Sequence, residues 1–536
     1  MEKADTPAIA PPHPMLVAVV VSLAAFMEVL DTTITNVSLT HIAGSLAASQ
    51  NESSWVLTSY LVANGIVLPL SGWLAGVMGR KNFFLLCITC FTVASFACGI
   101  ATSLPVLIGF RLLQGLAGGG LQPMQQAIIM DSFPPEKRGV AFGITGITMV
   151  VAPILGPTLG GYITDHFSWR WIFFMNVPVG LLAVLLVKAL VTDPPHARAK
   201  GLFSIDYIGM GLLALGLGAM QIVLDKGEED DWFDSHFIIL CTIVAAISLI
   251  AAFLWLWRQN EAIVDLRLLQ DRYFGPACLM IFVVGFVLYG SSTLLPMLVQ
   301  SQFGYDATLA GLVLSPGGLA VIVLMPTVGK LVNKIQSRYL IVVGMTLTGS
   351  GMAMTALFTP QTDYSTFVLM RILQVSGLPF LFVPISTMAF SAIPKEKSNK
   401  ASALFSMMRN LGGSFGIAII LSYLLQRQQW HQTILGQHLA TTDTAMQTTL
   451  ATVTRTLIDH GYPPSSAPTQ AMEVMHRHLM HHAVILGYGD AFQIFAVFIG
   501  TLAVAALFLP RNKIHEVKPP PPGMNDGRRK PNGNRQ

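Results

Sequence analysis

The sequence of 536 residues is poor in charge, because Asp, Glu, Lys and Arg together make up only 11% of it. In soluble domains these four residue types make up about 25% of the chain, so the composition excludes an ordinary water-soluble protein. No GxxxxGK(S/T) loop, zinc motif or catalytic triad stands out, which gives ATP-driven work and hydrolysis little support. We therefore predict that the chain is not an enzyme. The five cysteines lie within apolar runs and indicate no disulfide framework.

Hydrophobic residues are abundant, at 53% of the chain. They form runs of about 20 residues, each long enough to cross about 30 Å of hydrocarbon. The predicted fold class is an all-α integral membrane protein with fourteen transmembrane helices. The predicted spans are 15–37, 53–75, 83–101, 105–127, 140–163, 169–191, 206–225, 236–256, 274–299, 308–330, 338–358, 365–391, 401–425 and 484–509.

Charge in the loops gives the orientation. Basic residues gather in alternate loops, such as Arg80–Lys81 and Lys137–Arg138, and in the C-terminal tail, while the acidic loop GEEDDWFD falls on the other side. Loops rich in Lys and Arg stay cytoplasmic. With an even number of spans, both termini are predicted to be cytoplasmic.

The chain also repeats itself. A shift of 260 residues aligns Arg111 with Arg371 and Gln114 with Gln374. Such shifts match spans 2, 4 and 5 with spans 10, 12 and 13, eight spans later. A repeated unit of six spans with an insert of two gives this offset, which predicts a 6 + 2 + 6 arrangement of two pseudo-symmetric six-helix halves. Such repeats place the substrate cavity between the halves. The predicted division is an N-terminal cytoplasmic segment (1–14), a first bundle (15–191), an inserted helix pair with its linkers (192–272), a second bundle (273–509) with a polar, partly helical external loop (426–483), and a disordered cytoplasmic tail (510–536).

Two carboxylates, Glu28 and Asp31, lie inside the first span. Residues three apart share one face of a helix. A charge near the bilayer centre costs about 2.5–3.5 kcal/mol and usually faces the bundle interior. The pair therefore predicts proton or cation handling. The alternative is that the acids only pair with an intramembrane arginine and hold helices together.

Arg111 in span 4 lies at a depth similar to that of Asp31, so we predict that these two side chains pair. Such a pair would keep Asp31 ionised. Glu28 lies one turn deeper without that help, and burial would favour its protonated form. Asp31, Glu28 and Arg111 are the predicted proton-coupling residues, and purely structural pairing remains the alternative.

Span 5 reads GITMVVAPILGPTLGG. Gly156, Pro157, Gly160 and Gly161 lie three and four residues apart, and small residues allow close approach of helices. Proline removes an intrahelical hydrogen bond and permits a kink. This pattern predicts a helix that pivots against a neighbour, with ordinary close packing as the alternative.

Other polar residues sit within the spans. Those predicted to line a substrate cavity are Asn36, Gln114, Gln122, Gln125 and Arg371. Hydrogen bonding between helices is the commoner role of such side chains. In the outer loop, His478 and His482 have the i,i+4 spacing of metal ligands, but only Glu473 lies nearby as an acid. We therefore predict a solvated helix face or a partner contact rather than a metal site.

These motifs resemble the major facilitator superfamily over nearly the whole chain. Within it, the chain resembles the 14-helix drug/proton antiporter branch of the EmrB/QacA type and is most similar to the EmrB subtype. The segments that carry the resemblance are LDTTITNV (Leu30 to Val37), FRLLQGLAGGG (Phe110 to Gly120), APILGPTLGG (Ala152 to Gly161) and WRWIFFMNVPVG (Trp169 to Gly180). The third of these is similar to the antiporter motif of helix 5, which marks exporters.

The resemblance implies lipophilic small-molecule substrates, a proton as coupling ion without any cofactor, and a bacterial inner membrane. It also implies a periplasmic adaptor and an outer-membrane channel as partners; no nucleic acid is predicted. The chain departs from the family at Thr40, where the first-helix motif usually has proline. It also departs at Gly76 in GWLAGVMGRK, where the loop motif has an acid.

The predicted function is a proton-coupled multidrug efflux antiporter that exports lipophilic compounds by alternating access. One alternative is an uptake transporter for a small polar solute. A second is a membrane sensor that transports nothing.

Overall fold

The computed structural model describes residues 13–134, 137–193, 206–259, 262–437 and 444–510. The predicted tail from residue 511 and nearly all of the N-terminal segment lie outside these residues. Within the described part the chain is helical and contains no strand. Its α-helices are α1 (Pro14–Ser45), α2 (Gln50–Met78), α3 (Arg80–Gly99), α4 (Leu104–Gly118), α5 (Leu121–Ser132), α6 (Arg138–His166), α7 (Trp171–Phe174), α8 (Asn176–Leu190), α9 (Tyr207–Lys226), α10 (His236–Arg258), α11 (Phe274–Phe303), α12 (Ala307–Leu331), α13 (Ser337–Ala356), α14 (Tyr364–Ser376), α15 (Leu378–Ala389), α16 (Ser398–Gln437), α17 (Thr444–Asp459) and α18 (Ala467–Ala506).

Fourteen helical segments in the described part are long and apolar enough to cross a membrane, which confirms the predicted number. Each overlaps one predicted span. Three of the spans consist of two consecutive helices, namely α4 with α5, α7 with α8, and α14 with α15. Because a helix satisfies its own backbone polar groups, such segments are suited to hydrocarbon.

The break between α4 and α5 falls on a run of three glycines, Gly118 to Gly120. A Cβ at Gly118 would lie 2.7 Å from the Tyr60 hydroxyl, and one at Gly119 would lie 2.7 Å from the Asn64 carbonyl oxygen. The backbone of span 4 therefore approaches α2 more closely than any residue with a side chain could. This contact places the polar residues of span 4 against α1 and α2.

Side-chain caps fix where several spans begin. Ser49 and Glu52 form a reciprocal capping box at the start of α2, with Ser49 N donating to Glu52 Oε2 at 2.8 Å. The Asp306 carboxylate accepts from Leu309 N at 2.6 Å at the start of α12, and Asp206 caps α9 in the same way. These caps satisfy backbone donors that the first helical turn leaves free.

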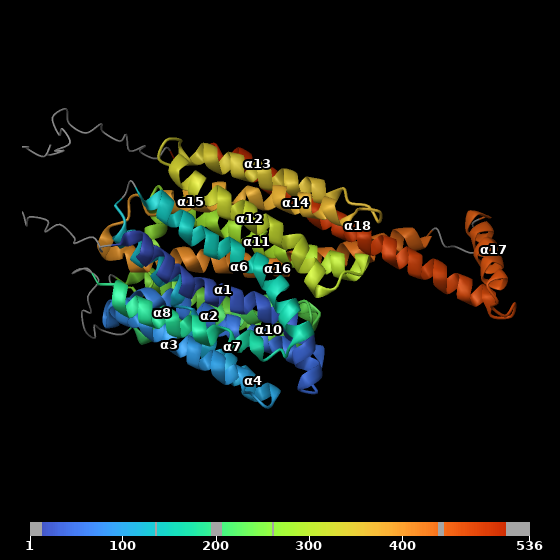
Figure 1. The fold of residues 1–536 in the computed structure, drawn as a ribbon, viewed down its shortest axis with the longest axis horizontal. Helices are drawn as coiled ribbons and strands as arrows, with labels where there is room; N and C mark the ends of the chain where they lie inside the picture. Colours follow the sequence, from blue (N-terminus) through green and yellow to red (C-terminus); the bar gives the residue numbers. More distant parts are fainter. Residues whose placement is uncertain (1–12, 135–136, 194–205, 260–261, 438–443, 511–536) are drawn as a thin grey trace, which may run out of the picture.

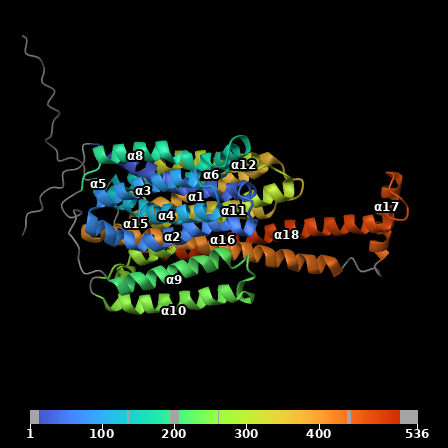
Figure 2. The same ribbon diagram turned by 90° about the horizontal axis from the view of Figure 1, so that it is seen from below.

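The helices run roughly parallel in one bundle, as Figures 1 and 2 show. Helix α6 packs against α1 on one side and α12 on the other, while α16 packs against α11 and α2. Helices α9 and α10 lie together at the edge of the bundle in Figure 2, where α9 packs on α2. The 6 + 2 + 6 arrangement and the domain boundaries remain predictions.

The structure changes our view of the segment 426–483, which the sequence predicts as a loop with some helix. Helix α16 continues to Gln437, and α18 already begins at Ala467, well before the predicted start of span 14 at residue 484. Both helices project beyond the bundle, with α17 at their tip (Figure 1). The polar composition marks where the chain leaves the apolar bundle, but it does not end the helices.

Candidate functional site

Asp31 and Arg111 form the predicted ion pair between α1 and α4. Arg111 Nη1 donates to Asp31 Oδ2 at 2.5 Å, and both side chains are at most 1% exposed. The guanidinium also donates through Nε to the Val56 carbonyl oxygen at 3.1 Å and lies over the Tyr60 ring, 4.2 Å from its centroid. A buried pair of this kind is stable only when its remaining polar atoms are also satisfied.

The second oxygen of Asp31 meets that condition. Asp31 Oδ1 accepts from Gln114 Nε2 at 3.0 Å and from Asn176 Nδ2 at 2.7 Å. Asn176 is a member of this site that our sequence predictions missed, although it lies within the segment similar to the family's sixth helix. One cationic and two amide donors thus surround the Asp31 carboxyl group.

Glu28 has a different environment one turn away on the same helix. Its Oε1 accepts from Asn64 Nδ2 at 3.0 Å and from the Tyr60 hydroxyl at 3.3 Å, and its Oε2 accepts from Gln122 Nε2. The side chain is 4% exposed, and no ion pair involves it among the described residues. All three donors are neutral, so Glu28 can gain a proton without breaking an ion pair. Of the two acids, Glu28 is therefore the better suited to changing its charge.

The predicted cavity residues separate into two groups. Gln114 and Gln122 contact the two acids, and Gln125 Nε2 donates to Ser22 Oγ at 2.8 Å, which ties α5 to α1. Asn36, in contrast, is exposed and does not join these residues. At about 100° per residue, five residues place it about 140° around the helix from Asp31. Asn36 therefore lies apart from the residues around the two acids, and its place in a substrate cavity remains a prediction.

Arg371 repeats the geometry of Arg111 in the second half of the chain. Arg371 Nη1 donates to Gln374 Oε1 at 3.1 Å, as Arg111 Nη1 does to Gln114 Oε1 at 2.8 Å. The residue that corresponds to Asp31 is Ser291, whose hydroxyl accepts from Arg371 at 3.3 Å. The repeat thus extends from sequence to contacts, but the acid occurs in the first half only.

Arg409 is the main residue that the sequence predictions missed. It lies on α16, is 1% exposed, and donates through Nη2 to Gln122 Oε1. Gln122 in turn donates to Glu28, so one amide connects α16 to the acid on α1. The available signal was an arginine well inside the predicted span 401–425, because such a charge needs a partner.

Helix α6 meets α1 at two of its predicted glycines. A Cβ at Gly156 would lie 2.0 Å from Thr33 Oγ1, and one at Gly160 would lie 3.2 Å from the Ile34 carbonyl oxygen. Pro157 lies between them inside the helix, and Gly161 is buried on the next turn. Both contact glycines face the same neighbour, as their spacing predicts. The pivoting of α6 at this contact remains a prediction.

At the end of the bundle predicted to be cytoplasmic, α16 contacts α2 and α3 without an acid at position 76. Arg80 is buried, pairs with Asp131, and donates to Ser398 Oγ at the start of α16 at 3.0 Å. A Cβ at Gly72 would lie 3.0 Å from the Asn399 carbonyl oxygen. At this end α16 therefore contacts α2 at Gly72 and α3 through the buried Arg80.

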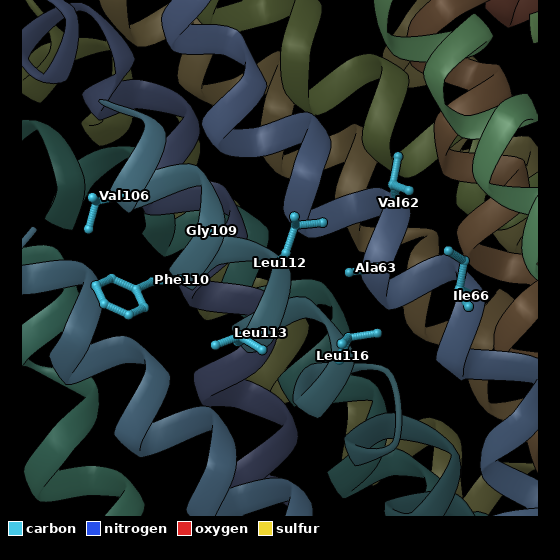
Figure 3. A pocket seen from close by; sticks show the side chains of 9 residues that line it. All are labelled: Val62, Ala63, Ile66, Val106, Gly109, Phe110, Leu112, Leu113 and Leu116. Atoms are coloured by element: carbon cyan, nitrogen blue, oxygen red, sulfur yellow. The ribbon is translucent and has the colours of Figure 1, made fainter. Parts of the chain in front are cut away.

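An apolar groove of about 720 Å³ lies between α2 and α4. Figure 3 shows Val62 and Ile66 of α2 facing Leu112 and Leu116 of α4 across it. Ligand sites usually add a few convergent polar groups to such a lining. This groove has none among its lining residues, so it does not resemble the buried site around Glu28 and Asp31.

The predicted histidine-rich run lies on the projecting part of α18. Among the described residues, no group of three His, Cys, Asp or Glu side chains is arranged to hold a metal ion.

Comparison with known proteins agrees with this geometry. The family model described as the Major Facilitator Superfamily matches residues 21–417. The chain belongs to this superfamily. It is 40% identical over 428 residues to the multidrug export protein EmrB of Haemophilus influenzae, a match that covers 79% of this chain and 83% of that protein. It is 38% identical to EmrB of Escherichia coli strain K12, over 79% of this chain and 82% of that one.

Solved structures of the superfamily share the fold. The proton:xylose symporter XylE superposes with a TM-score of 0.56 at 15% identity, covering 93% of this chain and 96% of that one. The human organic anion transporter MFSD10 superposes with a TM-score of 0.55 at 12% identity, covering 91% and 100%. These distant structures show the fold; the family match and the EmrB relatives indicate a multi-pass membrane transporter.

Proposed function

We propose that this protein is a proton-coupled exporter of lipophilic compounds that works by alternating access in a bacterial inner membrane. The observation that carries the proposal is the pair of buried acids with unlike partners. Asp31 is neutralised by Arg111, whereas Glu28 meets only neutral donors and lies beside the contact between α16 and the first helices. Glu28 is thus the proposed proton carrier, and Asp31 and Arg111 position the helices around it.

The relatives support the direction of transport. Two of them are named multidrug export proteins, and they are 40% and 38% identical to this chain over 79% of its length. The segment Ala152–Gly161, which resembles the antiporter motif, forms the contact of α6 with α1. Together these features favour export over uptake of a polar solute and over a sensor that moves nothing.

The energy available is sufficient for export. The membrane potential supplies about 2.3 kcal/mol per charge per 100 mV, and one pH unit adds about 1.36 kcal/mol. One inward proton therefore supports a gradient of a neutral compound of roughly a few hundredfold.

For partners, we propose that a periplasmic adaptor binds the projecting hairpin of α16, α17 and α18, and that an outer-membrane channel completes the assembly. The hairpin extends well beyond the bundle (Figure 2), which gives an adaptor a surface away from the lipid.

The test is a growth-inhibition panel in an efflux-deficient host, followed by accumulation of the best compound with and without a protonophore. Export predicts resistance to lipophilic compounds and lower accumulation that the protonophore abolishes. Higher accumulation of a solute in the expressing cells would indicate uptake and contradict the proposal.

A further inference from the structure

Arg409 is a buried arginine without a carboxylate of its own. Helix α16 lies directly on α11, since a Cβ at Gly412 or Gly416 would come within 2.0 Å or 2.3 Å of the carbonyl oxygens of Phe282 and Phe286. These contacts fix the backbone of Arg409 to α11, in the second half of the chain. Glu28 belongs to α1, in the first half.

A single side chain joins the two. Gln122 on α5 accepts from Arg409 Nη2 through Oε1 and donates to Glu28 Oε2 through Nε2. Arg409 Nη2 also lies 3.5 Å from Asn410 Oδ1, but Nε and Nη1 have no hydrogen-bond partner among the described residues. The hydrogen bond to Gln122 is therefore the main polar contact of the buried Arg409 guanidinium.

The strength of this bridge depends on the charge of Glu28. When Glu28 is ionised, both hydrogen bonds of Gln122 are charge-assisted and polarise each other in the same sense. When Glu28 binds a proton, the bridge loses its negative end and the guanidinium is left buried without compensation, which is costly in a membrane. The proton on Glu28 thus weakens a contact between the two halves.

The other charged and titratable groups around Glu28 do not make such a link. Asp31 and Arg111 neutralise each other on α1 and α4. Tyr60 on α2 donates its hydroxyl to Glu28, and Tyr289 on α11 is half-buried near both Glu28 and Arg409. From α5, Glu28 accepts only from the neutral amide of Gln122.

We propose that Arg409 is a positioning residue for coupling: through Gln122, it makes the contact between the two halves depend on the protonation of Glu28. This inference rests on the proposed function in that it takes Glu28 as the proton carrier.

The test is an infrared titration of the full-length protein in proteoliposomes, with protons as the only probe. The carboxylic-acid C=O band that Glu28→Gln removes reports the protonation of Glu28. Arg409→Gln removes the positive end of the bridge, Arg409→Lys keeps the charge, and Gln122→Met removes the link. The matched control is Ser406→Ala, because Ser406 Oγ lies on the same helix and reaches Gln126 Oε1 at 3.4 Å without contacting Glu28.

We expect Arg409→Gln to move the midpoint of the band by about one unit to higher pH, at the low end of the effect of an opposite charge because an amide separates the groups. Gln122→Met shifts it in the same direction, and adding it to Arg409→Gln changes little further. Arg409→Lys and Ser406→Ala stay near the parent. Melting temperature in detergent gives a second readout: lowering the pH should stabilise Arg409→Gln more than the parent, because the variant binds the proton on Glu28 more readily.

A parental midpoint in both Arg409→Gln and Gln122→Met would overturn the inference and leave the proposed function intact. Equal shifts in Arg409→Gln and Ser406→Ala would also overturn it, because they would indicate a general loosening of α16. Normal proton-driven export by Glu28→Gln would instead contradict the proposed proton carrier. If Arg409→Gln does not fold, Arg409→Lys and Gln122→Met decide the matter alone.

Discussion

The contact between α6 and α1 predicts that alanine lowers the stability of the protein at Gly156 but not at Gly160, one turn away. A Cβ at Gly156 would lie 2.6 Å from Thr33 Cβ and 2.0 Å from Thr33 Oγ1. Since carbon atoms pack at about 3.5–4.0 Å, α6 must move about 1 Å away from α1 to admit an alanine. Overpacking of this kind costs about 1–3 kcal/mol. We therefore expect Gly156→Ala to melt at a lower temperature than the parent.

Gly160 is the matched control. Its Cβ would lie 3.2 Å from the Ile34 carbonyl oxygen and 3.3 Å from Ile34 Cα, so a shift of a few tenths of an ångström suffices. Alanine also gains about 0.8–1.0 kcal/mol over glycine inside a helix. Gly160→Ala should therefore be about as stable as the parent. If Gly156→Ala is also as stable as the parent, the close approach of α6 to α1 is wrong.

The same variant separates packing from pivoting. Helix α6 is also held on its other side, where a Cβ at Gly311 of α12 would lie 2.4 Å from Thr158 Cα. Displacing α6 from α1 therefore presses it toward α12 and should impede movement between two access states. Compound binding in detergent requires only one state. Transport by Gly156→Ala should fall more than binding does; a parallel loss of both would support plain packing.

The remaining predictions concern the buried arginines and the projecting hairpin. Arg111→Gln leaves Asp31 buried without its cation and should lower the free energy of unfolding by about 3–5 kcal/mol, whereas adding Asp31→Asn should recover part of that loss in detergent melting curves. Arg371→Gln should cost less than Arg111→Gln in the same assay, because its partners are hydroxyls and an amide; an equal cost would show that the two sites are alike. Deleting Thr444–Asp459 should leave the melting temperature of the membrane bundle unchanged, and cellular resistance should fall if an adaptor binds there.

The features that could be predicted from sequence follow from one-dimensional spacing. Apolar runs give the spans because the membrane imposes their length. Asp31 and Arg111 could be paired because both lie at similar depths, and Gly156 and Gly160 share a face because they are four residues apart. Asn36 lies on another face of α1 from the acids, so its predicted place in the cavity does not follow from contact with them.

The features that could not be predicted depend on packing between distant helices. Arg409 reaches Gln122 only because α16 crosses the first half of the chain at that level, which no spacing within α16 reveals. The extent of the projecting hairpin was likewise missed, because polarity shows where a helix meets water but not where it ends. The side-chain partners of Glu28 come from α2 and α5, so its environment became visible only in the folded chain.

The measurement that tests the central claim most directly is proton flux in proteoliposomes that contain the full chain. Adding a compound exported in cells should start proton movement against the direction of the compound in the parent protein, and Glu28→Gln should abolish it while the compound still binds. Export by Glu28→Gln with undiminished proton movement would contradict the assignment of Glu28 as the proton carrier. Compound transport by the parent without any proton movement would contradict proton coupling itself.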